Sequence, residues 1–143
     1  MMQHWKIGVL SLFAGLTAVA CGGASGVNVS SKSDPSNPDT KQMIISWDGA
    51  GAGLYVTDEV AVTPTGYDEA VKGGTTYWAI EATAWPGGFD SPITYGHLPD
   101  GAKDVTAKNN GTSGGAPLVK GTAYKISIIG FGGSPTVQRM TWE

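Results

Sequence analysis

The stretch Thr122-Ala123-Tyr124-Lys125-Ile126-Ser127-Ile128-Ile129-Gly130 decides the fold class of this 143-residue chain. Bulky apolar side chains recur at every second position, at Tyr124, Ile126 and Ile128, and polar side chains stand between them. Because successive side chains of a β-strand point to opposite faces, this period of two predicts a strand with one buried face.

Several other short runs of β-forming residues repeat this pattern, and each of them ends at glycine, proline or polar turn residues. They cover residues 43–47, 54–57, 60–63, 76–84, 92–95 and 136–142. No window sustains a helical stripe of apolar residues beyond a turn or two. Short strands at turn-punctuated spacing are typical of an all-β fold. We therefore expect a single antiparallel β-sandwich over residues 43–143.

One segment within this region carries a family resemblance. Residues 118–128, Leu-Val-Lys-Gly-Thr-Ala-Tyr-Lys-Ile-Ser-Ile, resemble the penultimate strand of fibronectin type III domains, where leucine, Gly-Thr, tyrosine and alternating aliphatics recur at this spacing. The resemblance implies a fibronectin type III- or immunoglobulin-like sandwich. It also implies a structural corner, in which the Tyr124 hydroxyl bonds to backbone near the preceding turn and Leu118 fills the core beneath it.

The N-terminus has the layout of a cleaved signal. A basic start ending at Lys6 is followed by an apolar run over residues 7–20, which is shorter than the roughly 20 residues that a membrane-spanning helix needs. Small residues then precede Cys21, the only cysteine of the chain. Ala18-Val19-Ala20-Cys21 resembles the lipobox of bacterial lipoproteins. Residues 1–20 are therefore expected to be a lipoprotein signal peptide.

The lipoprotein resemblance implies a location. In this class the cysteine carries covalent lipid, so Cys21 would anchor the chain in the bacterial cell envelope and leave no thiol for a disulfide. Gly22, in place of aspartate, favours the outer membrane. Residues 21–42 are expected to be the lipidated cysteine and a flexible tether, because they contain almost only glycine and polar residues. Segments 78–81, 93–101 and 117–124 also resemble small uncharacterised bacterial lipoproteins, a group with no agreed activity.

Charge excludes one class of partner. Lys6 is the only formally charged side chain among the first 20 residues, so the rest of the chain carries eight basic and twelve acidic residues, a net charge of −4. Nucleic-acid binding depends on clustered lysine and arginine. We therefore expect no nucleic-acid partner.

The sequence offers little that predicts catalysis. His97 is the only histidine after residue 20, and the acids near it lack the spacing of metal ligands. The pairs Asp58-Glu59 and Asp68-Glu69 point to opposite faces if they lie in strands, so neither pair could flank a glycosidic bond. The spacing Gly-x-Ser-x-Gly occurs once, at residues 111–115, but no helical pattern follows it, so no nucleophile elbow is expected. We expect no catalytic residues, no metal site and no cofactor other than the lipid on Cys21.

Three aromatic residues are candidates for ligand binding. Trp85 and Phe89 lie in the loop Trp85-Pro86-Gly87-Gly88-Phe89, and Tyr95 follows shortly after. Such rings either stack on a sugar or anchor a protein partner, or Trp85 and Phe89 fold back as a lid over the sandwich. The main hypothesis is a non-enzymatic binding or structural module that contacts the membrane through its lipid and an envelope protein or glycan. The alternatives are a carbohydrate-binding module that uses these rings and, less favoured, a small envelope hydrolase.

Overall fold

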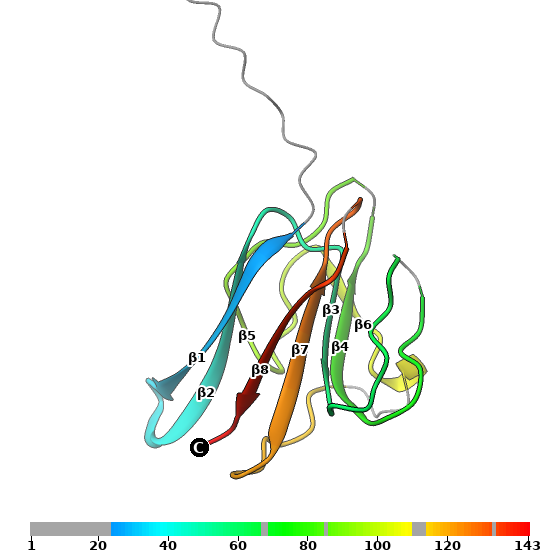
Figure 1. The fold of residues 1–143 in the computed structure, drawn as a ribbon. Helices are drawn as coiled ribbons and strands as arrows, with labels where there is room; N and C mark the ends of the chain where they lie inside the picture. Colours follow the sequence, from blue (N-terminus) through cyan, green and yellow to red (C-terminus); the bar gives the residue numbers. More distant parts are fainter. Residues whose placement is uncertain (1–23, 67–68, 85, 110–113, 133) are drawn as a thin grey trace, which may run out of the picture.

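The computed structural model describes residues 24–66, 69–84, 86–109, 114–132 and 134–143. They form two antiparallel sheets that pack face to face (Figure 1). The first sheet has the order β1-β2-β5, with strands β1 (Ser25–Asp34), β2 (Asn37–Asp48) and β5 (Ile93–Thr94). The second has the order β6-β4-β3-β7-β8, with strands β6 (Ala102–Asp104), β4 (Thr76–Ala82), β3 (Gly53–Thr57), β7 (Ala123–Ile129) and β8 (Thr136–Thr141). The expected all-β, single antiparallel sandwich is confirmed.

The core between the sheets is built from alternate residues of each strand. From β7 it takes Tyr124, Ile126 and Ile128, the three residues whose spacing predicts the strand. From β2 it takes Met43, Ile45 and Trp47. A short 3-10 helix, η1 (Ala107–Asn109), follows β6, and no helix among the described residues is long and apolar enough to cross a membrane.

The other face of the five-stranded sheet is also covered, which the sequence does not predict. Lys125 and Ser127 of β7 are buried there rather than solvated. The segment that follows β3 lies across them: the Lys125 ammonium donates to the Ala61 carbonyl oxygen, and the Thr63 and Ser127 hydroxyls lie 2.9 Å apart. Polar side chains are tolerated in this buried layer because each of them has a hydrogen-bond partner.

The flexible tether expected over residues 21–42 is not what the structure shows for residues 24–42. Strand β1 pairs with β2 over its whole length, and Pro35 and Ser36 form the turn between them, so the sandwich begins at residue 24 rather than at Met43. The Ser36 amide donates to the Asp34 carboxylate at 2.8 Å within this turn. The hairpin escapes detection because its outer half is exposed on both faces, so backbone ladder bonds rather than an apolar stripe define it.

The structure contains the corner that the fibronectin type III resemblance implies. The Val119 amide donates to the Tyr124 hydroxyl oxygen at 2.8 Å, across five residues of chain. Leu118 is half-buried and packs against the main core. This bond fixes the connection that leads into β7 and, with it, the position of residues 117–120.

Candidate binding groove

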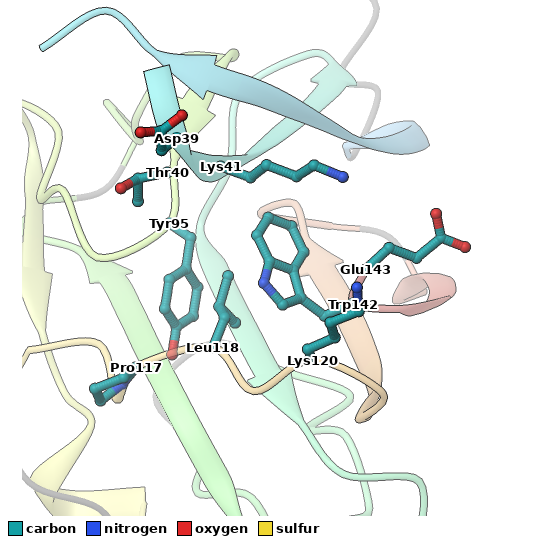
Figure 2. A pocket seen from close by; sticks show the side chains of 9 residues that line it. All are labelled: Asp39, Thr40, Lys41, Tyr95, Pro117, Leu118, Lys120, Trp142 and Glu143. Atoms are coloured by element: carbon teal, nitrogen blue, oxygen red, sulfur yellow. The ribbon is translucent and has the colours of Figure 1, made fainter. Parts of the chain in front are cut away.

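A cavity (Figure 2) lies at the end of the sandwich where β8 finishes (Figure 1). We call it the end groove; it has a volume of about 630 Å³ and is open to solvent. Its lining residues come from four separate segments of the chain: Asp39, Thr40, Lys41, Tyr95, Pro117, Leu118, Lys120, Trp142 and Glu143. Cavities of this size are typical of sites for small ligands.

Strand β2 supplies one wall because it extends beyond the end of the second sheet. Met43, Ile45 and Trp47 are buried on its inner face. The same alternation continues outward to Lys41 and Asp39, which are exposed and line the groove. The inner face of β2 therefore changes from apolar to charged where it leaves the core.

Tyr95 forms part of the base and is held in place by three contacts. Its amide donates to the Met43 carbonyl oxygen at 2.9 Å, and its hydroxyl donates to the Ala116 carbonyl oxygen at 2.6 Å. Its ring meets that of Trp78 edge to face, with centroids 5.4 Å apart. Burial raises the pKa of Tyr95, so this hydroxyl stays protonated well into the alkaline range.

A glycine allows the chain to lie against Tyr95. A Cβ atom at Gly115 would be 2.9 Å from Tyr95 Cε1, closer than real Cβ contacts allow. The absence of a side chain at this position lets residues 115–117 pass over the ring and place Pro117 and Leu118 in the groove.

Trp142 contributes the largest ring of the groove. Its backbone is fixed by two bonds: its amide donates to the Thr122 carbonyl oxygen at 2.9 Å, and its carbonyl oxygen accepts from the Gly121 amide at 2.7 Å. The residue is only 7% exposed, yet its indole nitrogen has no hydrogen-bond partner among the described residues. Figure 2 shows this nitrogen on the side of the ring that faces Leu118 and Tyr95.

Four charged side chains surround this base. Asp39 and Lys41 stand on the β2 wall, and Lys120 and Glu143 stand beyond Trp142 (Figure 2). None of the four forms an ion pair or a side-chain hydrogen bond with the described part of the chain. The groove thus combines an apolar base, one unpaired indole donor and a rim with two charges of each sign.

The structure separates the aromatic residues that the sequence grouped. Phe89 is 1% exposed and meets Trp47 edge to face at 5.8 Å, so the prediction of Phe89 as a ligand-stacking ring is corrected. Its segment is drawn inward by paired backbone bonds with Gly51, at 2.9 and 3.0 Å. Tyr95 lies at the other end of the sandwich and lines the end groove. Trp85, like Cys21, lies outside the described residues.

Most of the groove was missed by sequence reasoning. Trp142 ends a run that predicts a strand, and Lys41 lies in the segment expected to be a tether. Nothing in the local sequence of either residue distinguishes it from a packing or surface residue. Two residues of the groove carry a signal in the sequence: Tyr95, a candidate ligand-binding ring, and Leu118, which the fibronectin type III resemblance places in the core beneath the corner. Only the meeting of distant segments reveals that Leu118 lines a cavity as well as packing on the core.

The acids of the hydrolase alternative are engaged in local structure. The Asp58 carboxylate accepts bonds from the Ala61 and Thr75 amides at 3.1 and 2.9 Å and so closes a loop. The Glu59 carboxylate pairs with Arg139 at 2.8 Å on the surface. Asp68 lies outside the described residues.

Glu81 is a buried acid that the sequence predicts only as a strand residue. Its side chain is fully buried and accepts bonds from the Tyr55 hydroxyl and the Lys108 ammonium, each at 3.2 Å. It joins η1 to the covered face of the sheet, which is a structural role. Among the described residues, no group of three or more His, Cys, Asp or Glu side chains could hold a metal ion, and His97 is exposed in a turn.

Comparison of the chain with protein-family models, with curated protein sequences and with solved structures found no match.

Proposed function

We propose that this chain is a lipid-anchored, non-enzymatic module of the bacterial cell envelope, held in the outer membrane, and that it binds its partner through the end groove. The observation that carries the binding role is the groove itself, with its apolar base and unpaired polar rim. The proposed anchor is Cys21, which follows an apolar run and small residues in the manner of a lipobox.

The structure sharpens what such an anchor would do. Only Gly22 and Gly23 separate Cys21 from Ala24, which is buried and whose carbonyl oxygen accepts from the Thr136 hydroxyl at 3.2 Å. Three residues of extended chain span at most about 10 Å. A lipid on Cys21 would therefore hold the sandwich against the membrane surface rather than on a long tether.

This short connection also sets the direction of the groove. The start of β1 and the C-terminus lie at opposite ends of the sandwich (Figure 1). Strand β2 runs between these ends over 12 residues, a length of about 40 Å at 3.3 Å per residue. The anchor would thus point the end groove away from the membrane, where a partner in the envelope can reach it.

The hydrolase alternative is less favoured because its acids serve the fold, as the loop-closing bonds of Asp58 and the ion pair of Glu59 show. The carbohydrate alternative loses Phe89 but keeps Tyr95, which lines the groove. Hydrolytic turnover by the purified protein, abolished by one Asp or Glu substitution, would contradict the non-enzymatic role.

The anchor is tested by expressing the full chain and its Cys21→Ser variant in a Gram-negative bacterium supplied with labelled palmitate. We expect label and outer-membrane fractionation for the wild-type chain and neither for the variant, which should keep the circular dichroism spectrum of a folded β-protein. Label that persists in Cys21→Ser would contradict the proposal.

The binding role is tested by photo-crosslinking in cells. A photoreactive amino acid is placed at Lys120 in the groove or, as a matched control, at Lys103, an exposed lysine of the edge strand β6. We expect covalent adducts from position 120 and none from position 103. Equal yields from both positions, or no adduct from either, would count against the groove as the binding surface.

A further inference from the structure

The base of the end groove carries an indole donor that has no acceptor among the described residues. Trp142 is more than nine-tenths buried, and its Nε1–H has no partner among the described residues. Figure 2 shows this nitrogen turned toward the hollow beside Tyr95 and Leu118. The buried side-chain atoms without a partner among the described residues are Trp47 Nε1 and Thr76 Oγ1, so the Trp142 nitrogen opens to the groove, where water or a ligand that brings an acceptor can reach it.

The base around this donor is apolar and well fixed. Tyr95, Leu118 and Pro117 line it, and the hydroxyl of Tyr95 is already bonded to Ala116 at 2.6 Å. That hydroxyl therefore holds the ring in place and is not expected to contact a ligand. What the base offers is carbon surface, which suits the C–H face of a ring.

The rim offers hydrogen-bonding groups of both kinds without a net charge. Lys41 and Lys120 donate only, whereas the Asp39 and Glu143 carboxylates accept only. A strongly anionic or cationic ligand would meet two like charges at this rim. A ring with several hydroxyl groups fits better, because each hydroxyl both donates and accepts.

We infer that the end groove binds a sugar ring of an uncharged glycan, whose oxygen atoms accept from Trp142 Nε1–H and Lys41 and whose hydroxyls donate to Asp39. This inference rests on the proposed function, since it names the ligand class of the same groove. It replaces the loop rings Trp85 and Phe89 with a different set of contacts, all of them from the end of the sandwich where β8 finishes.

The test uses the full chain in detergent with ¹⁵N-labelled tryptophan side chains. The chain has five tryptophans, and the Trp142→Phe variant identifies the Trp142 indole signal. The probes are a trisaccharide of N-acetylglucosamine and a trisaccharide of glucose, which share the ring chemistry but come from different glycans. We expect at least one of them to shift the Trp142 signal saturably, while the buried Trp47 and Trp78 signals stay in place.

Matched variants test the rim. Asp39→Asn and Lys41→Ala should each weaken binding about tenfold, the size of one hydrogen bond to a charged group. Lys103→Ala, on an exposed lysine of β6, should leave the affinity unchanged. Equal weakening by Lys103→Ala would overturn the assignment of the rim.

The ligand class and the binding role can fail separately. A Trp142 signal that neither trisaccharide moves, or that moves only with a trialanine peptide, would overturn the glycan inference. The crosslinking experiment at Lys120 does not depend on ligand class. Adducts at this position, together with a Trp142 signal that neither trisaccharide shifts, would contradict the glycan inference and still support the binding role. Loss of those adducts would remove both.

Discussion

Replacing Tyr124 with phenylalanine tests the corner that orients the end of the sandwich. The change removes one hydroxyl, which accepts the Val119 amide at 2.8 Å, and keeps a ring that is fully buried in the core. A single hydrogen bond contributes about 1 kcal/mol net to stability. Because Val119 is exposed, water can replace the lost acceptor for its amide. The loss of stability therefore stays near this value and does not reach the larger penalty of a buried amide without a hydrogen bond.

The neighbouring Tyr77 provides a matched control. Its ring meets that of Tyr124 edge to face at 4.9 Å, but its hydroxyl donates no hydrogen bond within the described part of the chain. Tyr77→Phe therefore removes the same atom from an adjacent ring without removing a bond. We expect it to change the free energy of unfolding by less than about 0.5 kcal/mol, as is usual for substitutions that break no specific contact.

Urea denaturation followed by tryptophan fluorescence measures both variants. With a slope of about 1.5 kcal/mol per molar urea, a loss of about 1 kcal/mol lowers the Tyr124→Phe midpoint by about 0.7 M. The melting temperature should fall by about 4 °C. Equal midpoints for Tyr124→Phe and wild type, or an equal loss in Tyr77→Phe, would refute the reasoning that the Val119 bond stabilises the corner.

Other predictions concern stability. Burial raises the pKa of Tyr95, so the folded chain keeps a proton that the unfolded chain loses near pH 10. The contribution of this residue to the free energy of unfolding is therefore full below that pH and falls above it. Tyr95→Phe should flatten the fall in urea midpoints measured between about pH 8 and 11. Glu81→Ala removes the buried carboxylate that accepts from the Tyr55 hydroxyl and the Lys108 ammonium and should cost about 2 kcal/mol by urea titration, whereas Glu81→Gln, which keeps an acceptor, should cost less. Phe89→Ala should cost about 3 kcal/mol because its ring is buried; a change below about 1 kcal/mol would indicate that the ring is free for a ligand. A chain that lacks residues 1–42 should show no cooperative melt in calorimetry, since it loses β1 and half of β2; an unchanged melt would restore the tether interpretation.

The sequence by itself determined the fold class and one local feature, the corner that joins residues 118–120 to Tyr124. The alternation of Tyr124, Ile126 and Ile128 is a property of neighbouring residues, and it predicts the strand and its buried face before any partner is known. The spacing from Leu118 to Tyr124 likewise predicts the corner, because the bond spans only a few residues. Signals of this kind survive in sequence because they depend on local geometry.

The tertiary structure alone decided where the sandwich begins and where its candidate site lies. Strand β1 has few apolar residues, and only its pairing with β2 shows that it is folded, since ladder bonds between backbones leave no trace in side-chain patterns. Phe89 is buried because the chain turns inward against Gly51, a contact across 38 positions. The end groove exists because β2, Tyr95, Leu118 and Trp142 meet at one end of the fold. Contacts between residues so far apart depend on how the two sheets pack, and no local stretch of sequence specifies that packing.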